Sequence, residues 1–223
     1  YVLKTNSEPQ DRVGIFLNVQ AGSLNEDANQ SGLAHFLEHM LFNGTTHFKP
    51  GDLVDYFQSI GMSFGGDTNA YTTYEETVYK LILPKGDRHQ LEKGLLVASD
   101  YARGALLLES EIDRERGVII AEKTARDSAA YRAHKASTVF SFEGTLLPER
   151  MVIGDEQTLR HADRDDLKSY YDSWYRPENM ILVMVGDFDI VTIKPLIATY
   201  FSRLKGAGPA PLCPDYGDVQ HSG

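Results

Sequence analysis

Two histidines and a glutamate lie close enough along the chain to share a metal ion. His35, Glu38 and His39 form the pattern H-x-x-E-H, and Ser31 is placed to cap a helix that would run to about Asn43. On a helix, residues four apart lie on one face, so the two imidazoles can reach one ion at the distances that zinc prefers. The pattern therefore predicts that His35 and His39 are zinc ligands.

Glu38 lies on nearly the same helix face, beside the metal without having to bind it. Zinc lowers the pKa of a water bound to it to about 7, and a carboxylate at this position can take the proton as the water attacks a carbonyl. We therefore interpret Glu38 as a general base. The competing interpretations are an exposed polar helix with ordinary histidines, which the apolar flanks disfavour, and a purely structural zinc, which has no use for a base.

A zinc site needs at least one more protein ligand than these two histidines. A highly charged segment of strong helix formers, which we expect to form one long helix over residues 110–135, supplies the candidates. They are the glutamates in and just before it: Glu109, Glu111, Glu115 and Glu122. Glu115 and Glu122 lie two turns apart on one face, so one could bind the metal while the other orients a ligand. The spacing alone does not choose between these two.

The remaining pattern predicts an α+β domain in which helices pack on a mostly antiparallel sheet. We expect strands at residues 13–19, 76–83 and 180–185, an extended segment at 62–70, and further helices at 52–60, 87–103, 163–174 and 190–204. Strands and helices do not alternate strictly, as they would in a parallel α/β fold. We place one domain at residues 1–205 and a linker at 206–223, because glycine and proline crowd that tail.

Composition excludes several classes of protein. The net charge of −10 argues against a nucleic-acid partner, because phosphate neutralisation needs clustered lysine and arginine. The sequence contains no apolar run long enough for a membrane span. Its one cysteine, Cys213, excludes an internal disulfide framework.

Three stretches resemble the pitrilysin or insulin-degrading-enzyme family of zinc metallopeptidases, the inverzincins, which carry the H-x-x-E-H motif. They are GLAHFLEHMLFNGTTHF (residues 32–48), SIGMSFGGDTNAYTTYEETVYKLILP (residues 59–84) and ERGVIIAE (residues 115–122). The resemblance runs in order from residue 1 to 205 and is closest in look to bacterial periplasmic zinc proteases. It implies that the chain is one αβ half, the N-terminal catalytic one, of a clamshell metallopeptidase whose cofactor is Zn²⁺.

The resemblance also implies a role for each residue of the site. His35, His39 and Glu122 match the family's metal ligands, and Glu38 matches its catalytic base. Glu115 matches the carboxylate that stands behind the ligands, and we count it with Glu38 among the catalytic residues.

Asn69 and Ala70 match the family's segment beside the active-site cleft, where an edge strand pairs with the substrate backbone. This implies that both residues contact substrate. A simple turn after a strand is the alternative interpretation.

These observations together predict a zinc-dependent metalloendopeptidase domain that acts on a peptide or unfolded protein substrate. The resemblance implies that it is weakly active or inactive without a second αβ half or a partner subunit. The alternative is a non-catalytic interaction or scaffold subunit of the same fold, against which the intact metal site argues. The compartment stays open, with the bacterial periplasm favoured by the resemblance.

Overall fold

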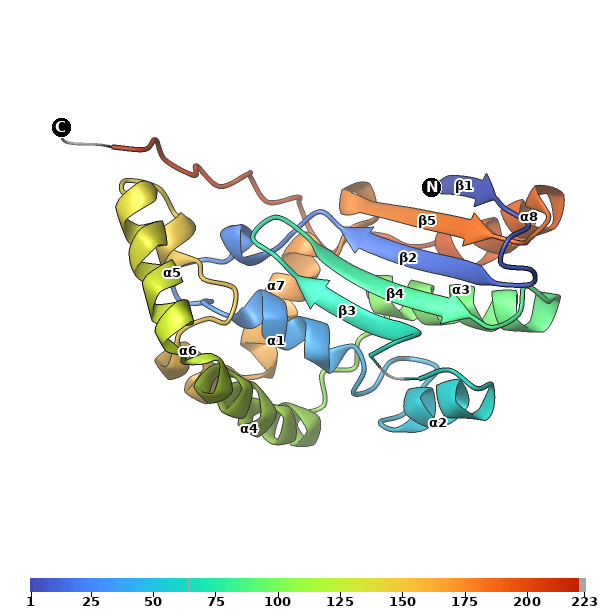
Figure 1. Cartoon of the computed structure of the whole chain (residues 1–223), viewed down its shortest axis with the longest axis horizontal. Coiled ribbons are helices and arrows are strands. Elements are labelled where there is room, and N and C mark those ends of the chain that lie inside the picture. The colour runs from blue at the N-terminus through green and yellow to red at the C-terminus, as the bar shows by residue number, and fades with distance from the viewer. Residues whose placement is uncertain (64, 221–223) are drawn as a thin grey trace.

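The computed structural model describes residues 1–63 and 65–220, and these contain one five-stranded sheet. Its strands are β1 (Val2–Thr5), β2 (Val13–Val19), β3 (Thr68–Thr72), β4 (Thr77–Leu83) and β5 (Met180–Gly186). The order across the sheet is β1-β5-β2-β4-β3, so β3 forms one edge (Figure 1). All neighbouring strands are antiparallel except β1 and β5, which run parallel. The predicted mostly antiparallel sheet is confirmed.

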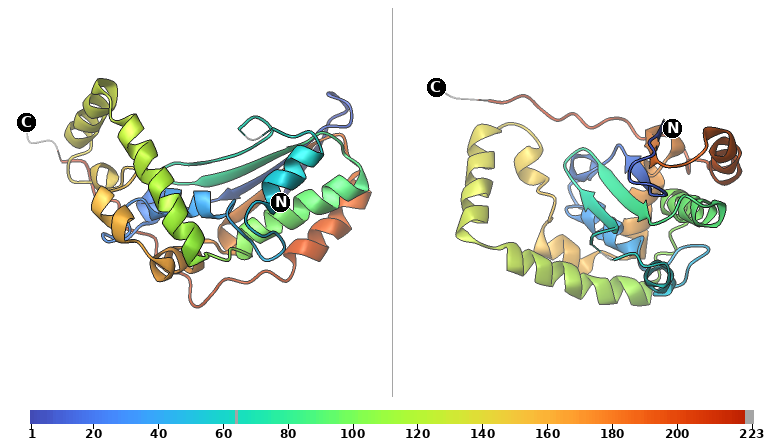
Figure 2. Two further views of the ribbon diagram at one scale, coloured as in Figure 1. Left: turned by 90° about the horizontal axis from the view of Figure 1, so that it is seen from below. Right: turned by 45° about the vertical axis from the view of Figure 1, so that its right-hand side comes forward.

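Within the described residues, eight α-helices accompany the sheet. They are α1 (Leu33–Met40), α2 (Asp52–Ser59), α3 (Arg88–Arg103), α4 (Glu109–Arg126), α5 (Ala129–Ser141), α6 (Glu156–His161), α7 (Arg164–Trp174) and α8 (Ile190–Phe201). Helix α3 packs against β2, β4 and α8, and Figure 2 shows α3 and α8 on the same side of the sheet. Helix α1 contacts β3, α4 and α7. The helix that carries the H-x-x-E-H motif is therefore held from three directions.

The central strand β2 has the bounds predicted from the sequence. Val13, Ile15 and Leu17 are buried, whereas Phe16 and Asn18 are half-buried. Successive side chains of a strand point to opposite faces, so the first set faces the helices. The run VGIFLNV looks continuously apolar as a sequence, but only one of its faces belongs to the main core.

Aspartate side chains cap the starts of α3 and α7. The Asp87 side chain accepts a hydrogen bond from the Gln90 N–H at 2.9 Å. Asp163 accepts one from the Asp166 N–H at 3.0 Å, and the Asp166 carboxylate accepts one from the Asp163 N–H at 3.1 Å. Such caps satisfy N–H groups that have no partner inside the helix. The two helices start within one residue of the predicted positions.

The single long helix expected over residues 110–135 is wrong. The segment divides into α4 and α5, which meet at Asp127 and Ser128. The Ser128 hydroxyl accepts a hydrogen bond from the Tyr131 N–H at 3.1 Å and so caps a new helix. A serine that bonds nearby backbone competes with the helix that precedes it, and this ends α4. Figure 1 shows α5 turned away from the axis of α4.

The extended segment expected at residues 62–70 is also placed differently. Strand β3 begins only at Thr68 and continues to Thr72. The Asp67 carboxylate accepts hydrogen bonds from the N–H and the hydroxyl of Ser63, both at 2.9 Å, and this loop keeps the preceding residues out of the sheet. Residue 64, which belongs to the predicted segment, lies outside the described residues.

The tail from residue 207 to 220 forms no helix or strand. Arg176 anchors its start by donating to the carbonyl oxygens of Ala207 (2.8 Å) and Gly208 (3.2 Å). The tail then runs past the C-terminal end of α5, where the Leu146 N–H donates to the Tyr216 carbonyl at 3.0 Å. The linker assignment of residues 206–223 stays a prediction, and its last three residues lie outside the described ones. No helix in the described residues is long and apolar enough to cross a membrane.

Candidate metal centre

Glu26, and not the predicted Ser31, caps the helix that carries the H-x-x-E-H motif. The N-cap position is Gly32, whose left-handed backbone (φ 96°) favours glycine. The Glu26 carboxylate is buried and accepts hydrogen bonds from the N–H groups of Gly32 (3.0 Å) and Ala34 (2.9 Å). Gly154 crosses so close that a Cβ on it would lie 2.4 Å from the Gly32 Cα. A buried carboxylate from the preceding loop therefore satisfies the first N–H groups of α1.

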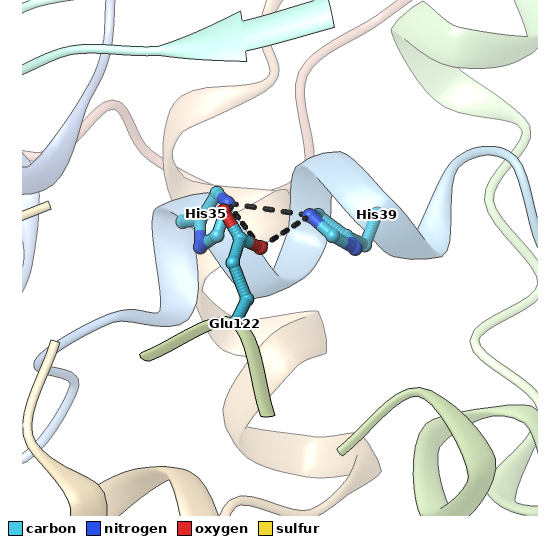
Figure 3. Close-up of side chains that lie close together, drawn as sticks. All are labelled: His35, His39 and Glu122. Atoms are coloured by element: carbon cyan, nitrogen blue, oxygen red, sulfur yellow. Dashed lines mark hydrogen bonds and ion pairs between the residues drawn. The ribbon is translucent and has the colours of Figure 1, made fainter. Parts of the chain in front are cut away.

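His35 and His39 of α1 and Glu122 of α4 point toward one another (Figure 3). The two Nε2 atoms are 3.2 Å apart, and each lies 3.6 Å from Glu122 Oε2. Acceptor atoms aimed at one point repel one another, and a cation among them turns this repulsion into attraction. Two imidazole nitrogens and a carboxylate oxygen form a ligand set of catalytic zinc, which keeps a fourth position open. The residues fit a zinc ion.

Glu115 holds His39 from the side opposite the cluster. Its Oε1 lies 2.8 Å from His39 Nδ1, and its Oε2 accepts a hydrogen bond from Asn43 Nδ2 at 3.1 Å. When the neutral imidazole donates its N–H to this carboxylate, Nε2 keeps a lone pair that faces Glu122. The structure thus brings Glu115 to the place that a ligand-orienting carboxylate needs.

Burial changes the protonation of the polar residues on α1. Burial and the nearby His39 lower the pKa of His35 to about 4, so this imidazole is neutral at neutral pH and free to bind metal. Burial also acts to lower the pKa of His39, but the hydrogen bond to Glu115 and the surrounding carboxylates raise it above its usual value. Burial raises the pKa of Glu38, against a smaller lowering by its hydrogen bond from Thr72. A carboxylate with a raised pKa is the stronger proton acceptor.

The tertiary structure separates the four glutamates that the sequence offered as ligands. Glu122 reaches the two histidines and Glu115 stands behind one of them. Glu111 instead pairs with Arg114 at 2.5 Å. Glu109 begins α4 and lines a separate cavity between that helix and the start of α7. Glu109 and Glu111 therefore lie outside the candidate metal site formed by His35, His39 and Glu122.

Two cavities adjoin the cluster, and edge strand β3 lines both of them. A cavity of about 300 Å³ contains His35 and Glu122, and one of about 530 Å³ contains Glu115. Asn69 and Ala70 of β3 line both cavities, beside the candidate metal ligands. Among the described residues, β3 has a sheet neighbour on one side only. Its other edge can accept a further strand.

Two known protein families match separate segments of the chain. The description "Insulinase (Peptidase family M16)" matches residues 1–143, and "Peptidase M16 inactive domain" matches residues 161–223. The chain belongs to peptidase family M16. The resemblance to the pitrilysin or insulin-degrading-enzyme family is confirmed.

Several known relatives of this M16 chain are zinc proteases by name. The probable zinc protease PqqL of Escherichia coli is 36% identical over 204 residues, which make up 92% of this chain and 22% of that protein. A crystal structure of the first half of the E. coli periplasmic protease PqqL matches with a TM-score of 0.90 and 34% identity, covering 98% of this chain and 46% of that one. The ferredoxin protease FusC, crystallised with Arabidopsis ferredoxin, matches with a TM-score of 0.89 and 32% identity, covering 97% of this chain and 24% of that one.

These likenesses confirm the predicted fold class and, at the level of the family, the zinc cofactor. The M16 chain spans less than a quarter of the length of PqqL and slightly less than half of the first half of that protein. Most of a PqqL-sized protein therefore has no counterpart in these residues.

Some polar residues of the M16 site were not identified from the sequence. Asn43 and Arg126 each follow a site residue by four positions, and this helical spacing could have identified them. Arg126 donates to Glu122 Oε1 at 2.5 Å. Thr72 donates to Glu38 Oε2 at 2.6 Å across 34 positions of sequence. Nothing local in the sequence points to that last pair.

Proposed function

We propose that this chain is the zinc-binding domain of a metalloendopeptidase that hydrolyses peptide bonds. One observation carries the proposal. The ligand atoms of His35, His39 and Glu122 converge within 4.8 Å of one another, with the buried Glu38 carboxylate beside them. A purely structural site has no use for an adjacent base.

In this proposal His35, His39 and Glu122, which all line the smaller cavity, would hold the zinc ion. When bound, zinc would supply the Lewis acidity that acidifies a water molecule and polarises a peptide carbonyl. Glu38 takes the proton from the attacking water and returns it to the leaving nitrogen, the two halves of general acid–base catalysis. Glu115 keeps His39 in one tautomer and one orientation throughout.

The substrate in this proposal is a peptide or an unfolded protein segment that extends along β3. Asn69 and Ala70 lie on that strand and line both cavities. An extended peptide gains main-chain hydrogen bonds when it adds to an exposed sheet edge. The FusC relative crystallised with a ferredoxin supports a protein partner for the family.

We further propose that a second αβ half or a partner subunit completes the active site, because the cavities beside the candidate metal site are open and the related PqqL is several times longer. The isolated chain should then bind zinc but cleave peptides weakly or not at all. Since the related PqqL is described as periplasmic, the bacterial periplasm is the proposed compartment.

The test combines zinc titration with cleavage of an unstructured peptide by the full-length protein. We expect zinc-dependent cleavage, and we expect Glu38→Gln to bind zinc as tightly as wild type while cleaving at least about 100-fold more slowly, because general-base catalysis contributes about 100- to 10,000-fold. Hydrolysis that persists in Glu38→Gln would refute the catalytic proposal in favour of a structural zinc. Zinc binding with no cleavage by wild type would favour a scaffold subunit.

A further inference from the structure

Thr72, at the end of the edge strand β3, has one hydroxyl proton and two oxygen neighbours that could receive it. Its Oγ1 lies 2.6 Å from Glu38 Oε2 and 3.5 Å from Thr77 Oγ1. The Thr77 hydroxyl is already used, because it donates to the Ala21 carbonyl at 3.0 Å. A carboxylate can only accept, and the shorter distance is typical of a charge-assisted hydrogen bond. The Thr72 hydroxyl therefore donates its hydrogen bond to Glu38.

Glu38 has little else to hold its carboxylate in place. It is buried, and among the described residues no side chain or N–H other than the Thr72 hydroxyl donates to it. A glutamate on a helix can rotate about three side-chain torsions, so burial alone does not define where its oxygens point. A donor on a different element ties one of those oxygens to the sheet and leaves the other available.

We infer that Thr72 is a positioning residue that orients the general base Glu38 from the strand along which the substrate extends. This inference rests on the proposed function and adds to it a link between two parts of the site. Asn69, Ala70 and Thr72 belong to one strand of five residues, whose backbone is fixed by pairing with β4. The strand that binds the peptide in the proposed function thereby also orients Glu38, the general base.

The kinetic experiment compares Thr72→Val, Thr72→Ser and Thr68→Val in the zinc-loaded full-length protein. Valine keeps the shape of threonine and removes the hydroxyl, and serine restores it. Thr68 is the matched control, because it lies on the same strand, is fully buried and has a hydroxyl with no hydrogen-bond partner in the described structure. Its replacement by valine removes no interaction with the base.

We expect Thr72→Val to lose about 10- to 100-fold in kcat, the range for one hydrogen bond to a charged group. KM and the zinc dissociation constant should stay within about twofold of wild type, because a positioning role acts on the chemical step. Thr72→Ser should recover most of the loss, and Thr68→Val should match wild type. Wild-type kcat in Thr72→Val, a serine variant no better than valine, or zinc affinity that falls in parallel with kcat would overturn the inference.

A second measurement needs no enzymatic activity. Thr72→Val should lower the urea unfolding midpoint in the Glu38 background and leave it unchanged in a Glu38→Met background, where no carboxylate remains to lose its donor. An equal shift in both backgrounds would mean that Thr72 acts independently of Glu38 and would overturn the inference. The proposed function fails separately, if wild type shows no zinc-dependent cleavage or Glu38→Gln retains it, whatever the outcome of this cycle.

Discussion

The two helices that supply the candidate metal ligands, α1 and α4, differ in how many of their residues are buried. Seven of the eight residues of α1 are buried, whereas Ile112 and Ile119 are the buried residues among the eighteen of α4. Glu115 and Glu122 are spaced by seven residues like the two isoleucines, and each follows an isoleucine by three. Residues three and seven apart share a helix face, so the carboxylates lie on the stripe that packs inward.

The candidate metal site thus combines a deeply buried helix with one that has few buried residues. Helix α1 is fixed by its own burial and by its contacts to β3, α4 and α7. Helix α4 depends on a narrow apolar stripe, and a bound cation would add attraction between the two helices at the end of that stripe. We therefore expect α1 to govern stability and α4 to respond to the metal.

The largest expected effect comes from the core of α1. Leu37→Ala should cost about 2–5 kcal/mol of unfolding free energy, because Leu37 is fully buried and its surroundings on three sides cannot close the cavity. Ile119→Ala should cost less although Ile119 is also fully buried, since the exposed α4 can shift inward. Urea unfolding of both variants measures this. An equal or larger loss of unfolding free energy in Ile119→Ala would contradict the expectation that α1 contributes more to stability than α4.

The next effect concerns the ligand that α4 supplies. Glu122→Gln should weaken zinc binding by more than about 100-fold, exceeding the usual 10- to 100-fold effect of residues behind the ligands. Chelator competition gives the affinity. Glu109→Gln is the control, because Glu109 lies on the same helix and lines a different cavity. Equal affinities in the two variants would remove Glu122 from the proposed ligand set.

A smaller loss is expected from the carboxylate behind His39. Glu115→Ala should weaken zinc binding by about 10- to 100-fold, because the imidazole loses the acceptor that fixes its orientation. Glu111→Ala, one turn earlier on the same helix but paired with Arg114, should leave the affinity unchanged. If both variants lose affinity alike, the effect is one of overall helix charge.

The smallest effect tests the far end of α4. Ser128→Ala removes the N-cap of α5 and should cost about 1 kcal/mol, with faster amide exchange in the first turn of α5. Zinc affinity should not change, because α4 ends before this cap. Ser110→Ala, at an exposed serine of α4, serves as the control. Loss of zinc affinity in Ser128→Ala would show that the corner between α4 and α5 also supports the cluster.

Most of the fold could be predicted from the sequence where the signal was local. The bounds of β2, α3 and α7 depend on neighbouring residues, and these predictions are confirmed to within one residue. The division between α4 and α5 was missed because Ser128 stands among strong helix formers and its effect depends on a single side-chain hydrogen bond. The capping residue of α1 was predicted wrongly, because the carboxyl group that accepts from its first N–H groups belongs to Glu26 in the preceding buried loop.

The sequence by itself determined which face of α1 carries His35, Glu38 and His39, because the helical period alone places them together. Helical spacing left Glu115 and Glu122 as alternatives and the family resemblance favoured Glu122, whereas only the tertiary structure places Glu122 beside the histidines and pairs Glu38 with Thr72. Glu115 lies 76 positions from His39, and such a distance depends on how two helices cross, which no local pattern encodes. The packing of Ile112 and Ile119 against the core turns α4 so that Glu122 meets the histidines and Glu109 does not.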